Sequence, residues 1–477
     1  MDRYDVVVIG AGIGGLICGI YLANAGLKVC IIEKNANVGG YCASFTRNNY
    51  KFDIGVHYLG GIKKGLLGKI LEELDLKDRI QFNQFDPADK IIIDGKKIYI
   101  RADPKETIKE FIINFPKQKD NIEKFFSFIM ENNFAQIYKK VSGLTFRNLL
   151  DSFFDDYELK TMIEGLTYNI GISAKFVAAI TAVILYKEYL LDPGYYPIGG
   201  MQNFPDALAN KFEQNGGKIV LNKEVENIFI QNKKVKGVKL TTGELINSKI
   251  LISNVDANHT FKKLLNKVNS KGYNLLKKLY ISPSLFVVYL GLKENLTNLT
   301  NETCNIWSFD NPIQDSYFSN LKKNLKNIPF VMVSFPSAHE YREEDKISNK
   351  STMQIFQFAP FESKRFWEGS KDLMYQKTIE RVEKILPGLK DEIKISVLAT
   401  PFTFYKYTYS KNGAAFGWLS TIDQLKSTIF PWKSEISNLF FVGHWVTTGE
   451  GQGGISKVIF SARKIAMLIL HEIRQKK

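Results

Sequence analysis

Hydrophobic positions near the start of the chain alternate between short β-branched runs and one longer helical pattern. Asp5 to Ile9 is β-branched, residues 13 to 25 carry apolar side chains at helical spacing, and Lys28 to Ile32 is apolar again. The segment Gly10-Ala-Gly-Ile-Gly-Gly15 separates the first run from the helix. The pattern therefore predicts a strand, a glycine-rich turn, a helix and a second strand.

The glycines of this turn have distinct expected roles. Gly10 permits the tight turn, Gly12 lets a pyrophosphate approach the backbone, and Gly15 lets the helix pack close to the strand. The helix N-terminus favours negative charge. Glu33 follows the second strand, where it can accept hydrogen bonds from an adenosine ribose. A tight turn without a ligand is the alternative, but the combination favours a dinucleotide, either NAD or FAD.

Two later stretches of the sequence also show short strand-like runs, one over residues 218–253 and one near the end of the chain. Polar turns separate four strand-like runs, and a fifth run precedes glycines that open a final helix reaching Leu470. The five runs are Lys218–Leu221, Val225–Ile230, Val235–Leu240, Lys249–Ser253 and Leu439–Val442. The helix that opens at residues 451–454 predicts a second N-terminus directed at a cofactor.

The intervening sequence mixes helical and strand patterns. Helices are predicted over Leu66–Leu76, Ile108–Phe115, Asn121–Tyr138, Phe146–Phe154 and Gln202–Gln214, and strands over Leu285–Leu292, Phe330–Phe335 and Gln354–Phe358. The longest uncharged apolar run, Phe176 to Tyr186, is far shorter than the ~20 residues that span a bilayer. We expect no transmembrane helix, and this run is either a buried helix or the border of an entry for a lipid-soluble substrate.

Composition narrows the class of protein. The 477 residues are 45% hydrophobic and 24% charged, which excludes wholesale disorder. The net charge of +15 favours anionic partners, either lipid headgroups or nucleic acid. Four cysteines without paired or metal-ligand spacing predict reduced thiols in the cytoplasm and no metal site. Aromatic residues, at 13%, suit a long apolar pocket as well as a large core.

Later motifs extend the first one. Gly39-Gly40 follows Glu33, and the other motifs are Lys51–His57, Tyr196–Gln202, Ile252–Asn254 and Phe440–His444. With these motifs the chain resembles the phytoene desaturase and carotenoid isomerase family, including retinol saturase-like members, within the FAD-linked amine oxidase superfamily. The resemblance covers nearly the whole chain and implies bound FAD.

The family resemblance implies an α/β fold in two parts. A discontinuous Rossmann-like FAD-binding domain would comprise residues 1–60, 199–280 and 430–477, and a mixed α+β substrate-binding domain residues 61–198 and 281–429. The cofactor residues would be Gly10, Gly12, Ile13, Gly14, Gly15, Glu33, Lys34, Gly39, Gly40, Val225, Asn254, Gly443, His444, Gly453, Gly454 and Ile455. His444 departs from the acidic residue that the family commonly has after this glycine.

The same resemblance suggests substrate and catalytic residues. Tyr196, Gly199 and Gly200 would close over the substrate pocket. His57 would run beside the flavin ring as the one catalytic candidate, orienting substrate or relaying a proton, although a structural histidine fits equally.

We therefore expect an FAD-dependent oxidoreductase acting on a long apolar polyene or isoprenoid, similar to a carotenoid desaturase or isomerase. The alternatives are a retinol saturase-like lipid reductase, a flavin amine oxidase, and a basic nucleic-acid-binding protein, for which no motif is present. The expected partners are a hydrophobic small molecule and, through paired lysines, an anionic membrane surface, with no nucleic acid. The direction of the reaction, the electron acceptor and the oligomeric state stay open.

Overall fold

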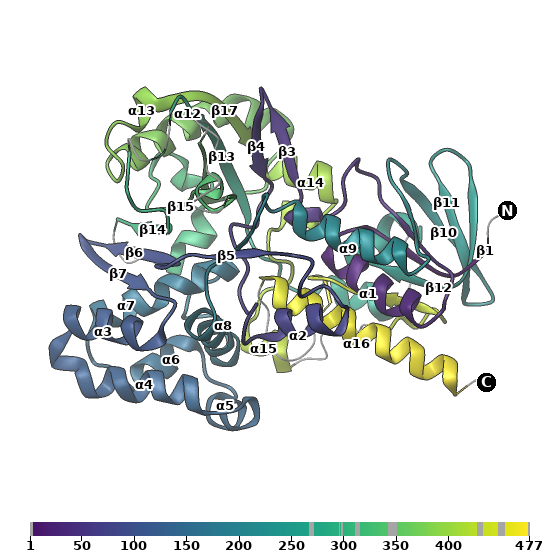
Figure 1. Ribbon diagram of the computed structural model, residues 1–477, viewed down its shortest axis with the longest axis horizontal. Helices are drawn as coiled ribbons and strands as arrows, with labels where there is room; N and C mark the ends of the chain where they lie inside the picture. Colours follow the sequence, from purple (N-terminus) through teal and green to yellow (C-terminus); the bar gives the residue numbers. More distant parts are fainter. Residues whose placement is uncertain are drawn as a thin grey trace.

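Two seven-stranded sheets organise the chain and lie towards opposite ends of the molecule (Figure 1). The computed structural model describes residues 3–266, 271–294, 296, 299–310, 315–341, 351–426, 433–446 and 454–475. The cofactor sheet has the order β10-β11-β12-β1-β2-β9, and β18 also pairs with β12. We use "substrate sheet" for the other sheet, whose order is β17-β13-β16-β15-β14-β6-β7.

The cofactor sheet is assembled from three separated stretches of sequence. Its strands are β1 (Arg3–Ile9), β2 (Val29–Ile32), β9 (Lys218–Val220), β10 (Val225–Gln231), β11 (Lys234–Leu240), β12 (Leu245–Ser253) and β18 (Leu439–Phe441). Five of them, β9, β2, β1, β12 and β18, pair in parallel, with Val8 between Ile31 and Ile252. The predicted discontinuous Rossmann-like fold is confirmed.

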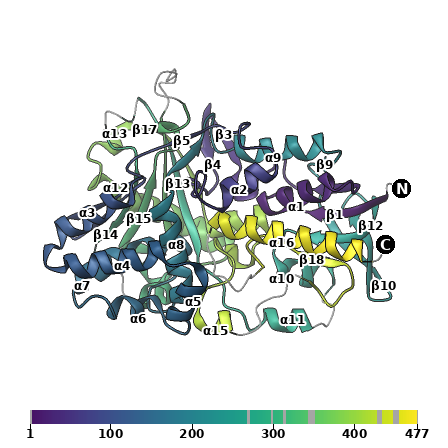
Figure 2. The same ribbon diagram turned by 60° about the horizontal axis from the view of Figure 1, so that its bottom comes forward.

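Helices cover one face of this sheet. They are α1 (Ile13–Asn24), α2 (Leu66–Glu73), α9 (Asn203–Gln214) and α16 (Gly454–Arg474). Figure 2 shows α1 and α16 side by side, and their apolar side chains share one core with Phe212. Leu67 and Ile70 of α2 lie in that same core. The predicted domain boundary at residue 61 stays a prediction. Helix α2, which follows that boundary in sequence, packs with the cofactor sheet.

The substrate sheet is antiparallel except where β14 pairs with β6. Its strands are β6 (Asp89–Ile93), β7 (Lys96–Ile100), β13 (Ser284–Leu292), β14 (Asn305–Phe309), β15 (Phe330–Ser334), β16 (Thr352–Ala359) and β17 (Ile393–Ala399). Side chains alternate between two cores, as strand geometry requires. Trp307 and Phe358 pack towards the helices on one side, whereas Ile306 and Ile355 pack towards α12 (Lys364–Glu383) on the other.

The helical layer over this sheet consists of α3 (Pro104–Asn114), α4 (Lys119–Glu131), α5 (Phe134–Val141), α6 (Phe146–Asp151), α7 (Tyr157–Glu164), the 3-10 turn η3 (Gly165–Ile170) and α8 (Ala179–Leu191). The prediction of one helix over Asn121–Tyr138 is wrong. Asn133 and Gln136 form a capping box, which ends the first helix and starts α5. Residues 179–186 of the apolar run lie in α8, with Val183 and Tyr186 fully buried, whereas Phe176, before the helix, is 49% exposed. In the described part of the chain, no helix combines the length and hydropathy needed to cross a membrane.

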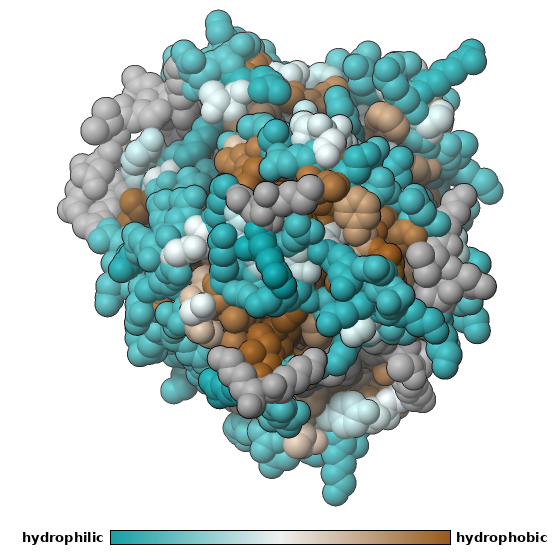
Figure 3. Space-filling model, turned by 90° about the vertical axis from the view of Figure 1, so that its right-hand side faces the viewer, coloured by the Kyte–Doolittle hydropathy of each residue, from teal (hydrophilic) through white to brown (hydrophobic). Residues whose placement is uncertain are grey.

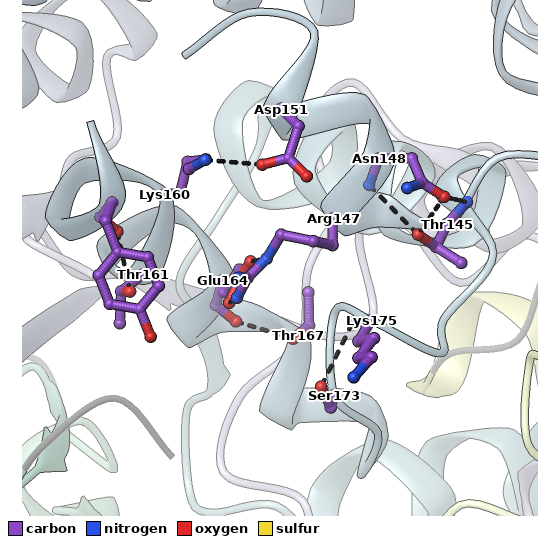
Figure 4. A network of polar contacts seen from close by, with 11 residues as sticks. Thr145, Arg147, Asn148, Asp151, Lys160, Thr161, Glu164, Thr167, Ser173 and Lys175 are labelled. Atoms are coloured by element: carbon purple, nitrogen blue, oxygen red, sulfur yellow. Dashed lines mark hydrogen bonds and ion pairs between the residues drawn. The ribbon is translucent and has the colours of Figure 1, made fainter. Parts of the chain in front are cut away.

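Polar contacts between α6, α7 and the turn η3 hold η3 in place (Figure 4). Two guanidinium nitrogens of Arg147, on α6, contact the two carboxylate oxygens of Glu164, at the end of α7. The Thr167 hydroxyl, within η3, donates a hydrogen bond of 2.7 Å to the Glu164 carbonyl oxygen. This network holds η3 against the helical layer, and η3 carries two residues, Tyr168 and Asn169, that line the site described next.

Candidate cofactor and substrate site

A single cavity of about 1120 Å³ is lined by residues from both sheets. From the cofactor sheet and its loops come Gly10, Gly12, Ile13, Gly14, Glu33, Lys34, Gly39, Gly40, Val225, Asn254, Gly443 and His444. From the substrate sheet and its helices come Tyr168, Asn169, Thr181, Leu185, Glu188, Trp307, Phe330, Met332, Phe356 and Phe358. One continuous space therefore joins the dinucleotide motif to a chamber walled mainly by aromatic side chains.

The glycine turn packs so closely against neighbouring segments that side chains could not be accommodated there. A Cβ atom on Gly14 would lie 2.7 Å from Asn254 Oδ1 and 3.2 Å from the backbone of Gly443, and one on Gly15 would lie 2.2 Å from the Gly10 oxygen. Helix α1 begins at Ile13, and its N-cap residue, Gly12, provides no side-chain cap. Its first N–H groups are therefore open to an anion, as pyrophosphate binding requires.

Glu33 is held in place at the end of β2. One carboxylate oxygen accepts a hydrogen bond of 2.8 Å from the Ala11 N–H, and the other accepts two from Asn35, at 2.9 and 2.8 Å. Each oxygen has two acceptor positions, so the carboxylate keeps capacity for a ribose hydroxyl. Beside it, Lys34 Nζ lies 3.8 Å from the ring centroid of Tyr409 at the cavity wall.

Two later segments complete the cradle. Asn254, directly after β12, donates from Nδ2 to the Gly10 oxygen at 3.1 Å, and the Gly443 N–H donates to Ser461 Oγ at 3.1 Å. Val225 on β10 and the α16 residues Gly454 and Ile455 also line the cavity. Gly453 lies outside the described residues. The narrow glycine backbone, the open helix N-terminus and the fixed acid together fit a dinucleotide such as FAD.

His444 and Lys457 form a buried pair at the N-terminal end of α16. Lys457 Nζ donates a hydrogen bond of 3.0 Å to the His444 carbonyl oxygen. Burial and the nearby Lys457 lower the pKa of His444 to about 3, and burial lowers that of Lys457 to about 7. His444 Nε2 has no hydrogen-bond partner among the described residues. The neutral imidazole therefore offers a polar atom to a cofactor, which fits the role that the sequence suggested for it.

His57 lines the same cavity on the substrate side. Its Nδ1 lies 3.1 Å from Nδ2 of Asn305, on β14. Burial lowers the pKa of His57 to about 4, against the effect of a side-chain hydrogen bond to Asn169. The ring is therefore neutral near pH 7, and it can donate or accept one hydrogen bond at each nitrogen.

Sequence reasoning missed Asp89, a buried carboxylate beside His57. It accepts hydrogen bonds from the Tyr58 hydroxyl at 2.6 Å, from Trp307 Nε1 at 2.7 Å, and from Asn305 Nδ2 at 3.4 Å. Burial raises the pKa of Asp89 to about 6, while these hydrogen bonds lower it. Only the position of Asp89 before three consecutive isoleucines could have indicated a strand with an acid at its start.

Tyr196, Gly199 and Gly200, predicted to close over the substrate pocket, are not among the described residues that line the cavity, and their role stays a prediction. The Tyr196 hydroxyl donates to the Asp53 carboxylate, at the end of β4 (Tyr50–Asp53). Lys51 Nζ donates to the Gly199 oxygen at 2.6 Å. The loop therefore packs against β4.

Aromatic rings build the chamber from several strands. Phe330 on β15 lies 6.1 Å from Trp307, 5.4 Å from Phe358 and 5.5 Å from Tyr168, measured between ring centroids. These contacts fix the wall in place, and their dispersion over β14, β15, β16 and η3 explains why sequence periodicity did not reveal it.

The fold and this site define a class: enzymes that hold a flavin dinucleotide beside an enclosed substrate chamber. The family model described as "Flavin containing amine oxidoreductase" matches residues 13–470, and the chain belongs to that family. It is an oxidoreductase, and FAD is its cofactor, as the sequence predicted.

Curated relatives cover most of the chain at low identity. The chain is 24% identical to an all-trans-retinol 13,14-reductase of Danio rerio, covering 93% of this chain and 82% of the relative. It is 25% identical to a 4,4'-diapophytoene desaturase of Methylomonas sp, covering 99% and 96%. It is 27% identical to prolycopene isomerase 1 of an Oncidium hybrid cultivar, covering 86% and 75%.

Solved structures share the fold. An oxidoreductase from Methanosarcina mazei superposes with a TM-score of 0.70 at 17% identity, covering 97% of this chain and 99% of that one. A redesigned putrescine oxidase superposes with a TM-score of 0.66 at 16% identity, covering 98% and 99%. These likenesses show the architecture alone.

Proposed function

We propose that the substrate of this FAD-dependent oxidoreductase is a long apolar polyene or isoprenoid, processed by a desaturase- or isomerase-like reaction. One observation carries the proposal, namely the continuity of the glycine cradle with a chamber walled by Trp307, Phe330, Phe356 and Phe358. Aromatic walls bury the surface of an elongated apolar molecule and exclude water. The desaturase and isomerase names among the relatives agree with this reading.

The residues of the chain would bind the cofactor, orient the substrate and exclude water from the chamber. Bound FAD supplies the redox chemistry, by exchanging a hydride with a carbon–carbon unit. The glycine turn, Glu33 and Asn254 would hold the adenine and pyrophosphate end, and His444 with the start of α16 would hold the flavin end. His57 stays our candidate for orienting substrate, as a neutral imidazole in the chamber wall.

Pigment analysis tests the proposal. We would express the chain in a bacterial host that accumulates acyclic carotenoid precursors and analyse the extracted pigments by absorbance and mass. The expected result is a precursor changed in double-bond number or geometry, absent when Gly14→Ala replaces the wild type. Unchanged pigments in cells that contain the yellow holoprotein would overturn the polyene assignment while leaving the flavoprotein assignment intact.

A lipid reductase similar to the retinol reductases is the same site run in the opposite direction, and it requires an external reductant. A flavin amine oxidase is favoured by one residue, Glu188 on α8. Glu188 lines the cavity, and burial raises its pKa to about 7, so the side chain is only about half ionised at neutral pH, and an ammonium group bound beside it would favour the carboxylate. Peroxide release from primary or secondary amines, lost in Glu188→Gln, would identify that activity.

We also propose that the protein contacts anionic membrane from the cytoplasmic side, near the part of the cavity lined by α5. Phe134, which lines the cavity, is 42% exposed and stacks on Tyr138, which is 47% exposed, at 6.1 Å between centroids. Lys64 and Lys69 line the cavity as well. By contrast, the end of the molecule shown in Figure 3 is mostly hydrophilic, with hydrophobic side chains in recesses.

Vesicle flotation tests the membrane contact. We expect the protein to float with vesicles containing phosphatidylserine and less with neutral ones, because the chain is basic. Phe134→Ser with Tyr138→Ser should abolish flotation, whereas Tyr157→Ser, at a 56% exposed position on α7, should not. Equal flotation of all three proteins would contradict the assigned surface.

A further inference from the structure

We propose that Asn169 and Thr181 form a polar subsite in the aromatic chamber that binds an oxygen atom of the substrate. The preferred polyene or isoprenoid would then carry a hydroxyl or carbonyl group and would not be a pure hydrocarbon. This inference rests on the proposed function, because it specifies the substrate class of the same chamber.

Asn169 presents an unused donor to the cavity. It lies in η3 and lines the cavity, and its Nδ2 is buried without a hydrogen-bond partner in the described part of the chain. Buried polar atoms in native proteins are almost always hydrogen-bonded, so an orphaned amide in a cavity wall points to a ligand. The ion pair of Arg147 and Glu164 holds η3 in place (Figure 4). The backbone that carries the Asn169 amide is therefore fixed.

A chain of hydrogen bonds determines which atom of Asn169 is left without a partner. Asp89 as a carboxylate only accepts, so Asn305 must direct its NH₂ group towards it, and Asn305 Nδ2 is also the atom 3.1 Å from His57 Nδ1. His57 Nδ1 is therefore an acceptor, and the ring proton of the neutral imidazole sits on Nε2.

The hydrogen bond between His57 and Asn169 follows from that tautomer. With its proton on Nε2, His57 donates to the Asn169 oxygen, which is the direction that favours the protonated ring. The NH₂ group of Asn169 is then left over. The chain that starts at the buried Asp89 thus ends in a donor directed at the ligand.

Thr181 supplies the second polar atom. It lies in the first turn of α8, which packs against η3, and it lines the same cavity. Its side chain is 2% exposed, and Oγ1 has no hydrogen-bond partner within the described residues. Close by on the cavity wall, Ile184 and Leu185 are apolar. A hydrocarbon in this chamber would leave both polar groups unsatisfied, whereas a hydroxyl or carbonyl oxygen can accept a hydrogen bond from either.

The test compares two ligands that differ by one oxygen. The wild-type holoenzyme is dialysed to equilibrium against detergent micelles carrying either all-trans-retinol or the hydrocarbon in which a methyl group replaces the terminal CH₂OH. Bound ligand is extracted and measured by mass spectrometry, so the readout is independent of activity. We expect the alcohol to bind at least about tenfold more tightly, which corresponds to about 1.4 kcal/mol.

Three variants assign that difference to the subsite. Asn169→Leu and the shape-matched Thr181→Val should each reduce the preference for the alcohol severalfold without weakening hydrocarbon binding. Ser420→Ala is the matched control, since Ser420 Oγ is also buried and unpartnered among the described residues but is absent from the cavity wall. Its preference should equal that of the wild type. Flavin content equal to the wild type establishes that each variant is folded.

Three results would count against the inference. Equal binding of both ligands by the wild type overturns the subsite and leaves the proposed function standing. A preference for the alcohol that survives in Asn169→Leu and Thr181→Val also overturns it. Failure of both ligands to bind the flavin-loaded enzyme overturns the proposed function and the inference together.

Discussion

At the scale of single residues, Gly14 shows how closely three backbone segments approach each other around the cofactor. A Cβ atom added to Gly14 would lie only 2.7 Å from Asn254 Oδ1 and 3.2 Å from the backbone of Gly443. Residues from three distant parts of the chain therefore meet at one point. Gly14 and Glu33 could be predicted from sequence because their spacing along one βαβ unit carries the signal. Asp89 and Asn169 could not, because their partners come from β14 and from the loop after β4.

Replacing Gly14 tests this approach. Gly14→Ala should displace Asn254 and reduce the flavin-to-protein ratio of the purified protein by at least about tenfold. Gly369→Ala is the control, since a Cβ there meets nothing within 4 Å in α12. That change should leave the flavin content intact and add about 0.5–1 kcal/mol of stability through helix propensity. A yellow, fully loaded Gly14→Ala protein would contradict the proposed cradle.

The neutral state of His57 is a second prediction at this scale. Its pKa is lowered to about 4 from 6.5, so nitrogen NMR of labelled histidines should show the Nε2–H tautomer unchanged from pH 8 to pH 5. The unfolded chain protonates this residue below pH 6.5 and the folded one below about 4. His57 therefore lowers the free energy of unfolding as the pH falls through that interval. Titration near pH 6.5 would show that the ring is solvated.

At the scale of elements, hydrophobic periodicity located the strands of the cofactor sheet and the helices that cover it, but it missed α12 and failed where side-chain chemistry decides. Asn133 splits the expected long helix into α4 and α5 because its capping box satisfies N–H groups that a continuous helix would bond internally. The strands β14 and β17 escaped prediction, since their partners are remote in sequence. The hairpin of β6 and β7 was missed although its turn, Asp94-Gly95, has positive φ at both residues and is a local hairpin signal.

The ion pair that fixes η3 predicts a measurable effect at this scale. Arg147→Met leaves Glu164, a side chain with 11% exposure, without its charge partner. We expect the free energy of unfolding in urea to fall by about 2 kcal/mol, below the usual cost of breaking a fully buried pair because Arg147 is partly exposed. Lys109→Met removes an exposed pair with Glu106 on α3 and should change stability by less than about 0.5 kcal/mol. Similar losses of unfolding free energy in both variants would contradict the role of the Arg147–Glu164 pair in supporting η3.

At the scale of the whole molecule, the cofactor site joins segments that the sequence separates widely. The turn at residues 10–15, the end of β12 and the end of β18 converge on one cradle, and α16 closes it from the C-terminal side. The family resemblance predicted this convergence, whereas local patterns alone gave only the separate strands. The contacts of the loop at Tyr196 with β4 were not predicted, because Asp53 and Lys51 are remote from it in sequence.

Removing FAD should therefore destabilise the molecule as a unit. A ligand at 100 times its dissociation constant stabilises the state that binds it by about 2.7 kcal/mol. We expect the apoprotein to melt at a lower temperature than the holoprotein and to recover on adding FAD. Gly14→Ala should not respond to added FAD. Identical melting of wild-type apo- and holoprotein would show that the three segments do not share the cofactor.

We propose that one continuous cavity brings an apolar polyene to the flavin. An anaerobic single turnover tests it most directly: stoichiometric holoenzyme, oxidised in one sample and reduced in another, is mixed with an acyclic polyene, and flavin redox state and polyene mass are followed together. We expect up to one polyene per flavin to be altered, with two hydrogens lost or gained for each flavin reduced or oxidised, or isomerisation without change of mass. A polyene recovered unaltered from both samples would contradict it.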